Sequence, residues 1–173
     1  GFFNNFDKRT IDLIYVGGCY FPKVLRIFRL KSHFGQRMRF YGRGWNKSNS
    51  LLKTMILKIL KILFRIPYIE ELPKDELVEL YQNTKVGFNT HMSYGPSNVR
   101  TYELPANGVM EISDCENGLN ELFVIDRDLV CYKTVGEAIK KIEFYLKNEQ
   151  ARNEIAANGY NKVITNYTFE KSM

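Results

Sequence analysis

Residues 86–114, VGFNTHMSYGPSNVRTYELPANGVMEISD, decide the fold, because they pass from a strand through a loop and a helix to a second strand. The run that ends at Asn89 is short and mostly apolar, and the loop after it contains Ser, Gly and Pro, which interrupt regular structure. Ser97 or Asn98 is placed to cap a helix, Gly108 is placed to end it, and a strand-like run follows. This order predicts a compact βαβ unit.

The start of this helix is a candidate binding site. In open parallel sheets, ligands bind beyond the carboxyl ends of the strands, where loops lead into helix N-termini. Arg100 and Glu103 lie three residues apart there and share a helix face with the capping residues Ser97 and Asn98 close by. A helix N-terminus favours an anion, an arginine fork suits phosphate, and a carboxylate accepts hydrogen bonds from sugar hydroxyls. The pattern predicts a nucleotide or nucleotide-sugar site; the alternative is a surface ion pair without a ligand.

Two more strand-like runs end in glycine turns at the same predicted edge. Ile11–Val16 stops at Gly17 and Gly18, and such a turn allows close backbone approach to a phosphate, although a plain tight connection gives the same pattern. Arg37–Tyr41 is followed by Arg43 between two glycines. Arg43 is therefore a candidate phosphate or acceptor contact, with a solvated turn arginine as the alternative.

Composition narrows the class of protein. The 173 residues are 45% apolar and 25% charged, which predicts one globular domain with a substantial core. Cys19, Cys115 and Cys131 are an odd number at no metal-ligand spacing, which indicates reduced thiols in a cytosolic protein and no metal site. The net charge of +6 favours nucleic acid, anionic membrane or phosphorylated ligands. The absence of an RNP, zinc-finger or helix-turn-helix pattern argues against nucleic acid.

The segment Leu51–Ile66 predicts a basic amphipathic helix. At 100° per residue its polar residues Thr54, Lys58, Lys61 and Arg65 share one narrow face, and most others are apolar. The helix is too short and too charged to span a bilayer, so one interpretation is that it lies on an anionic membrane surface. The alternative is that it packs on its own domain or on another domain. Residues 68–71, after Pro67, are predicted to form a short strand.

The runs NVRTYELPANGVMEISD (98–114) and NGLNELFVIDRDLVCYKTVGEAIKKIEFYLKNEQARNEIAANGYNKVITNYTFEKSM (117–173) resemble the C-terminal end of glycosyltransferases of the GT-B fold. The resemblance is strongest to the "glycosyl transferases group 1" type that includes the spore-maturation (CgeB-like) proteins, and it covers most of the chain apart from residues 46–66. Those families carry an Arg-x-x-Glu helix that ends in Ala-x-Gly and a helical tail with an Ile-Ala-x-x-Gly pattern. The matching positions are Arg100, Glu103, Ala106, Gly108, Ile155, Ala156 and Gly159.

The alternation of strands and helices predicts an α/β three-layer Rossmann-like domain over residues 1–173, with five or six mainly parallel strands. The resemblance implies the donor-binding half of an enzyme whose acceptor half precedes Gly1, which fits a chain that begins without a methionine or a signal peptide. It implies a nucleotide-diphosphate sugar as co-substrate, an unidentified acceptor, and no metal or other cofactor. Arg100 then neutralises the diphosphate leaving group and Glu103 holds the ribose.

His91, in the loop after the strand that ends at Asn89, is a further candidate catalytic group, with a structural histidine as the alternative. Two departures from the family pattern are visible. Related family 4 enzymes carry two glutamates eight positions apart, and the first falls at Gly95, which has no side chain. Pro105 is predicted to shorten or kink the Arg100 helix. A non-catalytic nucleotide-binding domain and a membrane-docking module of the same fold are therefore alternative functions.

Overall fold

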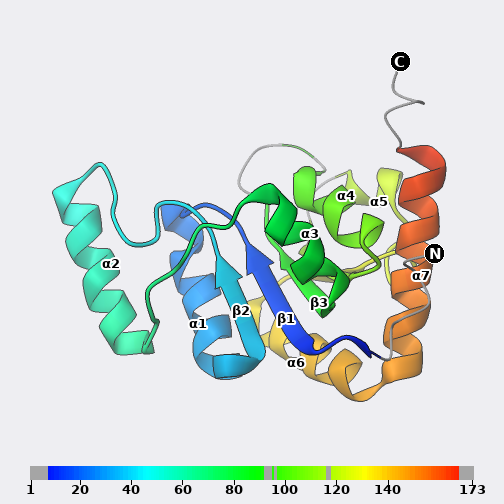
Figure 1. The fold of residues 1–173 in the computed structure, drawn as a ribbon, viewed down its shortest axis with the longest axis horizontal. Helices are drawn as coiled ribbons and strands as arrows, with labels where there is room; N and C mark the ends of the chain where they lie inside the picture. Colours follow the sequence, from blue (N-terminus) through cyan, green and yellow to red (C-terminus); the bar gives the residue numbers. More distant parts are fainter. Residues whose placement is uncertain (1–7, 92–94, 96, 116–117, 168–173) are drawn as a thin grey trace.

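The computed structural model describes residues 8–91, 95, 97–115 and 118–167. Its sheet has the strand order β2-β1-β3-β4-β5, and every neighbouring pair is parallel. The carboxyl ends of the strands therefore lie at one edge of the sheet (Figure 1), and the predicted Rossmann-like architecture is confirmed. The strands are β1 (Ile11–Val16), β2 (Met38–Tyr41), β3 (Thr84–Asn89), β4 (Met110–Asp114) and β5 (Val130–Tyr132).

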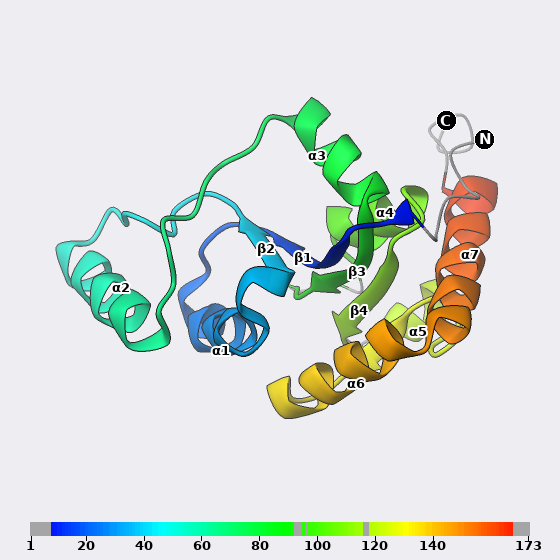
Figure 2. The same cartoon turned by 60° about the horizontal axis from the view of Figure 1, so that its bottom comes forward.

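Helices cover both faces of the sheet, which gives the three layers. α1 and α6 pack on one face and α3 and α4 on the other, while α7 packs along α4 and β4 (Figures 1 and 2). The helices are α1 (Val24–Phe34), α2 (Leu51–Phe64), α3 (Lys74–Gln82), α4 (Val99–Ala106), α5 (Leu119–Leu122), α6 (Val135–Lys147) and α7 (Glu149–Asn166), with 3₁₀ turns η2 (Phe21–Lys23) and η3 (Gly35–Arg37).

The core follows from the alternation of side chains along the strands. In β1, Leu13 faces the α1 and α6 side and the next residue, Ile14, faces the α3 and α4 side. Near β2, the rings of Phe40 and Trp45 pack edge to face with centroids 4.8 Å apart, and Tyr15 joins them. This aromatic cluster holds the loop after β2 against the end of β1.

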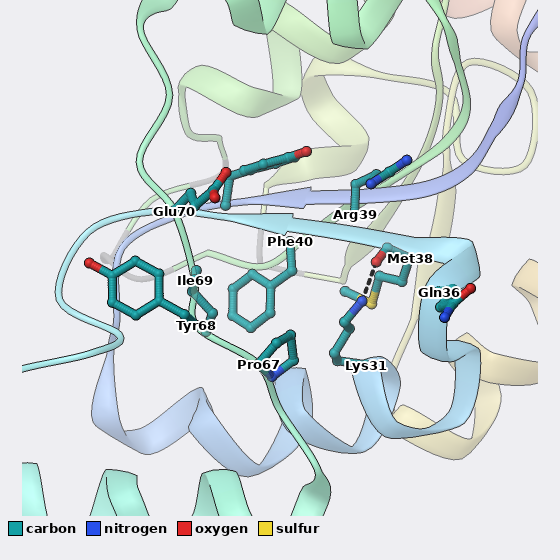
Figure 3. A pocket seen from close by; sticks show the side chains of 10 residues that line it. Lys31, Gln36, Met38, Arg39, Phe40, Pro67, Tyr68, Ile69 and Glu70 are labelled. Atoms are coloured by element: carbon teal, nitrogen blue, oxygen red, sulfur yellow. Dashed lines mark hydrogen bonds between the residues drawn. The ribbon is translucent and has the colours of Figure 1, made fainter.

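The prediction of a strand at residues 68–71 is wrong. Glu70 forms only an isolated parallel bridge with Tyr41, and its carbonyl accepts from the backbone N–H of Gly42 at 2.8 Å. The segment meets β2 only at the end of that strand. Ile69 is buried there and Tyr68 is exposed (Figure 3). The apolar character of Ile69 therefore reflects packing beside the sheet rather than strand pairing.

Helix α2 lies outside α1, at the margin of the molecule (Figure 2). Leu57 is buried, and the partly buried Phe64 packs its ring 6.2 Å from that of Phe28 on α1. One face of the helix thus packs on its own domain, as one of the two interpretations predicted. Among the described residues, no helix is long and apolar enough to cross a membrane.

Candidate functional site

A pocket of about 340 Å³ lies at the carboxyl edge of the sheet, between the ends of β1 and β3 and the start of α4. The chain continues from β1 to β2 on one side of β1 and then returns to β3 on its other side. Open α/β sheets bind ligands where the strand order reverses in this way. Four predicted site residues come together at this pocket although their sequence positions are far apart. It is lined by Tyr15, Val16, Gly17, Gly18, Asn89, Thr90, Asn98, Val99 and Arg100.

The start of α4 is fixed by a capping box. The Asn98 side chain accepts from the backbone N–H groups of Arg100 (2.9 Å) and Thr101 (3.2 Å), and the Thr101 hydroxyl accepts from the Asn98 backbone N–H (3.2 Å). Of the two predicted capping residues, Ser97 and Asn98, it is Asn98 that caps the helix. The cap occupies two first-turn N–H groups, so an anion in the pocket depends more on the Arg100 side chain than on the helix N–H groups.

The Arg100 guanidinium is held at the pocket by two acceptors. Its Nε donates to the carbonyl of Val16 at 3.1 Å, and its Nη1 forms an ion pair with Glu103 Oε2. Arg100 lines the pocket, whereas Glu103 is 41% exposed beside it. The arginine therefore lines the cavity with its charge paired to Glu103, and Glu103 is not among the residues that line the cavity.

Asn89 connects the pocket to a buried carboxyl group. Its Nδ2 donates to Glu111 Oε1 at 2.7 Å, and Asn89 and Asn98 exchange amide hydrogen bonds of 2.9 and 3.2 Å. Burial raises the pKa of Glu111 to about 8, against the opposing effect of the Asn89 hydrogen bond. Glu111 thus positions Asn89, and Asn89 in turn positions Asn98, the cap of α4. Sequence reasoning missed Glu111, because β4 also contains Ser113 and Asp114 and its sequence does not indicate which polar residue is buried against Asn89.

His91 is buried and does not line the pocket. Its ring has no exposed surface, and Nδ1 lies 2.7 Å from Asp114 Oδ1. The other Asp114 oxygen accepts from Thr90 (2.7 Å), Lys23 (3.0 Å) and Arg26 (3.1 Å). Burial opposes ionisation of Asp114, but the hydrogen bonds from His91, Thr90 and Lys23 outweigh it and hold its pKa well below the usual range. The arrangement ties the ends of β3 and β4 to α1.

Besides Glu103 and His91, two further sequence-predicted residues, Arg43 and Ser97, do not line this pocket. Arg43 is 88% exposed and pairs with Glu71 at 3.0 Å, because β2 is the outer strand and its loop turns away from α4. The hydroxyl of Ser97 accepts from Tyr102 at 3.0 Å and does not line the cavity. Gly95 takes the position of the first glutamate of family 4 enzymes. Among the described residues, no atom lies within 4 Å of where its Cβ would be. Residues 92–94 and 96 of the same loop lie outside the described residues.

A second hollow of about 370 Å³ lies at the free edge of β2, away from the carboxyl ends of β1 and β3 (Figure 3). Lys31 donates there to the carbonyl of Met38 at 2.5 Å, and Phe40 and Ile69 form its floor. It brings no cluster of acids or imidazoles together. In residues 8–91, 95, 97–115 and 118–167, no group of three or more His, Cys, Asp or Glu is placed to hold a metal ion.

Comparison with known proteins gives both a family and a fold. A family model described as glycosyl transferase-like matches residues 25–173. No curated protein matches the chain. Among solved structures, sucrose-phosphate synthase from Thermosynechococcus elongatus superposes with a TM-score of 0.72 at 12% identity, over 91% of this chain and 42% of that one. The Anabaena HepE protein in complex with UDP-glucose gives 0.71 at 11% identity, over 93% of this chain and 46% of that one.

A third structure matches over nearly its whole length. The C-terminal domain of the group 1 glycosyl transferase LpcC from Francisella tularensis gives a TM-score of 0.67 at 13% identity, over 97% of this chain and 92% of that domain. The chain thus spans less than half of the sucrose-phosphate synthase and HepE chains and nearly all of an isolated C-terminal domain.

Proposed function

Because the chain belongs to the glycosyl transferase-like family, we propose that it is the donor-binding half of a GT-B glycosyltransferase and holds a nucleotide-diphosphate sugar. The observation that carries this proposal is the pocket that joins Gly17, Gly18 and Arg100 at the carboxyl edge of β1 and β3. HepE, which shares the fold, is described in complex with UDP-glucose, with UDP and with UDP and glucose. The likeness to the spore-maturation type remains a prediction from the sequence motifs.

The residues divide the work by their chemistry. The glycine turn leaves room for a diphosphate beside the backbone, and the Arg100 fork supplies the positive charge that a leaving diphosphate needs. Glu103, which pairs with Arg100, accepts from the ribose hydroxyls once the nucleotide is bound. Fixed donors of this kind stabilise the leaving group without a metal ion. The acceptor is bound by a preceding domain, so this chain alone binds the donor without transferring its sugar.

Titration calorimetry with UDP, GDP, ADP and CMP tests the proposal. One nucleotide saturates the chain, and Arg100→Ala weakens that binding about 10- to 100-fold, the loss of a charge-assisted hydrogen bond. Glu103→Ala weakens it by a smaller factor because its hydrogen bonds are partly exposed to solvent. Arg127→Ala is the matched control, since it removes an exposed arginine that pairs with Asp128 outside the pocket.

Three results contradict the proposal. They are saturation by none of the four nucleotides, equal losses in Arg100→Ala and Arg127→Ala, and a loss in Arg43→Ala as large as that in Arg100→Ala. The last result places the anion at the end of β2, where Arg43 now pairs with Glu71.

A further inference from the structure

The outer face of α2 is an uncovered apolar surface. At 100° per residue, six large apolar side chains fall within an arc of about 120° on the side opposite Leu57, and Lys58 is at its border. Their exposed fractions run from 60% to 86%. Figures 1 and 2 both place α2 at the margin of the molecule, with α1 on its inner side. The six residues of this outer α2 face are Leu51, Leu52, Met55, Ile59, Ile62 and Leu63.

Positive charge lies next to this face, along one of its borders. Residues 13–69 contain twelve of the 25 Lys and Arg residues of the chain and none of its 19 Asp and Glu residues. The chain as a whole has a net charge of +6, so the excess is concentrated in β1, α1, β2, α2 and their loops. The exposed cations on and next to α2 are Lys47, Lys53, Lys58 and Arg65.

An exposed aromatic residue lies near the C-terminal end of α2. Tyr68 is 76% exposed just beyond the end of α2, and the ammonium of Lys61 lies 5.8 Å from its ring centroid. Tyrosine is enriched at the level of lipid headgroups, where its ring is in an apolar layer and its hydroxyl is in water. An apolar face, exposed cations and an exposed aromatic residue therefore occur together on and next to α2.

We propose that α2 lies flat on an anionic lipid surface, with its outer face in the headgroup region and its cations on lipid phosphates. The helix has 14 residues and is about 21 Å long, so it fits in the plane of a bilayer rather than across it. This composition, an apolar face bordered by Lys and Arg without acids, is that of interfacial helices. The inference stands apart from the nucleotide site, because no residue of the outer α2 face lines that pocket.

Charge selects lipid over the other occupants of an apolar face. A second copy of the chain would place cations near cations at the margin of the contact, with no Asp or Glu from residues 13–69 of either copy to pair with them, and like charges across an interface are costly. Lysine is also depleted in the buried centre of protein interfaces. A nucleic acid would engage the cations but would leave six apolar side chains in water.

Vesicle flotation of the whole chain tests this assignment. The chain floats with vesicles of phosphatidylcholine and phosphatidylglycerol, floats poorly with phosphatidylcholine alone, and dissociates as salt is raised. The variant Leu52→Gln/Ile59→Gln/Leu63→Gln stays in the bottom fraction. Because these side chains are exposed, its circular dichroism and its nucleotide affinity match those of the parent. Lys58→Gln and Arg65→Gln each lower the partition coefficient about fivefold.

Phe144→Gln on α6 is the matched control, because it removes a 53% exposed apolar side chain on another helix and leaves flotation unchanged. Flotation that is absent, or equal in the triple variant and the parent, overturns the proposal. So does a concentration-dependent dimer that is lost in the triple variant while neither protein floats, since that result assigns the face to a second copy.

Discussion

Glu111 is the residue whose chemistry departs furthest from its type. It lies in β4 between β3 and β5, is 1% exposed, and accepts a hydrogen bond from Asn89 through one of its oxygens. Burial raises its pKa from 4.5 to about 8. A carboxyl group that keeps its proton near neutral pH avoids placing a charge in the centre of the sheet.

Replacing Glu111 with Gln is expected to change the pH dependence of stability. Between pH 4.5 and about 8 the unfolded chain has lost the proton that the folded chain keeps, so the stabilising contribution of Glu111 is lost as pH rises through this range. The free energy of unfolding of the parent falls relative to that of Glu111→Gln by up to about 1.4 kcal/mol per pH unit. Urea unfolding at several values in this range measures the difference.

The exposed carboxylate of Glu121 provides the control, since Glu121→Gln should follow the parent at every pH. Asp114 does not interfere. Its pKa is lowered, so its contribution is present above its unfolded value of 3.8 and is lost only as pH falls below it. Parallel stability curves for the parent and Glu111→Gln would show that Glu111 is ionised in the folded state.

At the residue scale, local patterns located part of the site. Asn98 and Arg100 follow a strand and a loop in a predictable order, so the cap and the charge at the pocket were accessible from the sequence. Glu111 was not, because its environment depends on two neighbouring strands brought together from elsewhere in the chain. Arg43 shows the converse: its turn pattern is local, but the order of strands and its pairing with Glu71 decide where it points.

The packing of α7 on α4 requires a close approach between the two helices. A Cβ built on Gly159 would lie 2.4 Å from the carbonyl oxygen of Asp128 and 3.4 Å from Pro105 Cβ. The side chain therefore has no room, and α7 can lie against α4 and the turn before β5 only with glycine at this position. This gives a packing reason for the glycine in the Ile-Ala-x-x-Gly pattern.

Gly159→Ala is expected to destabilise the chain by about 1–3 kcal/mol in urea unfolding, the cost of forcing a methyl group into a packed contact. Gly136→Ala in α6 is the matched control, because the nearest atom to its built Cβ is the Thr134 hydroxyl at 4.0 Å. That variant should be unchanged or more stable by up to about 1 kcal/mol. Equal effects of the two changes would mean that helix propensity, rather than packing, governs position 159.

At the element scale, sequence periodicity predicted the helices and the central strands but not which segments pair. Pro105 is predicted to shorten α4, and the helix does end at Ala106, one residue later. The segment around Ile69 has strand-like composition yet makes only one bridge, because β2 is four residues long and is the outer strand of the sheet. In α2, the apolar pattern runs round most of the helix, so it could not distinguish the face on α1 from the exposed one.

Across the whole molecule, the two proposed surfaces occupy different sides. The nucleotide pocket lies at the carboxyl edge of β1 and β3, and the outer α2 face lies beyond α1 at the margin. The turn at residues 17–22 connects them, because Gly18 lines the nucleotide pocket while Cys19 lines a neighbouring hollow together with Lys53 of α2. A lipid surface on α2 would therefore lie beside the donor site rather than behind it.

Nucleotide binding should stabilise the domain as a unit. The pocket is built from β1, β3 and α4, and β1 contributes side chains to the cores on both faces of the sheet. A ligand that binds only the folded chain adds about 2.7 kcal/mol at 100 times its dissociation constant. For a chain of this length that corresponds to a rise in melting temperature of roughly 5–11 °C. Differential scanning calorimetry with the preferred nucleotide measures it. Under the proposed function Arg100 rather than a metal ion meets the diphosphate, so the rise should persist in EDTA, and it should shrink in Arg100→Ala but not in Arg127→Ala. A rise that requires added Mg²⁺ would transfer that role from the arginine to the metal.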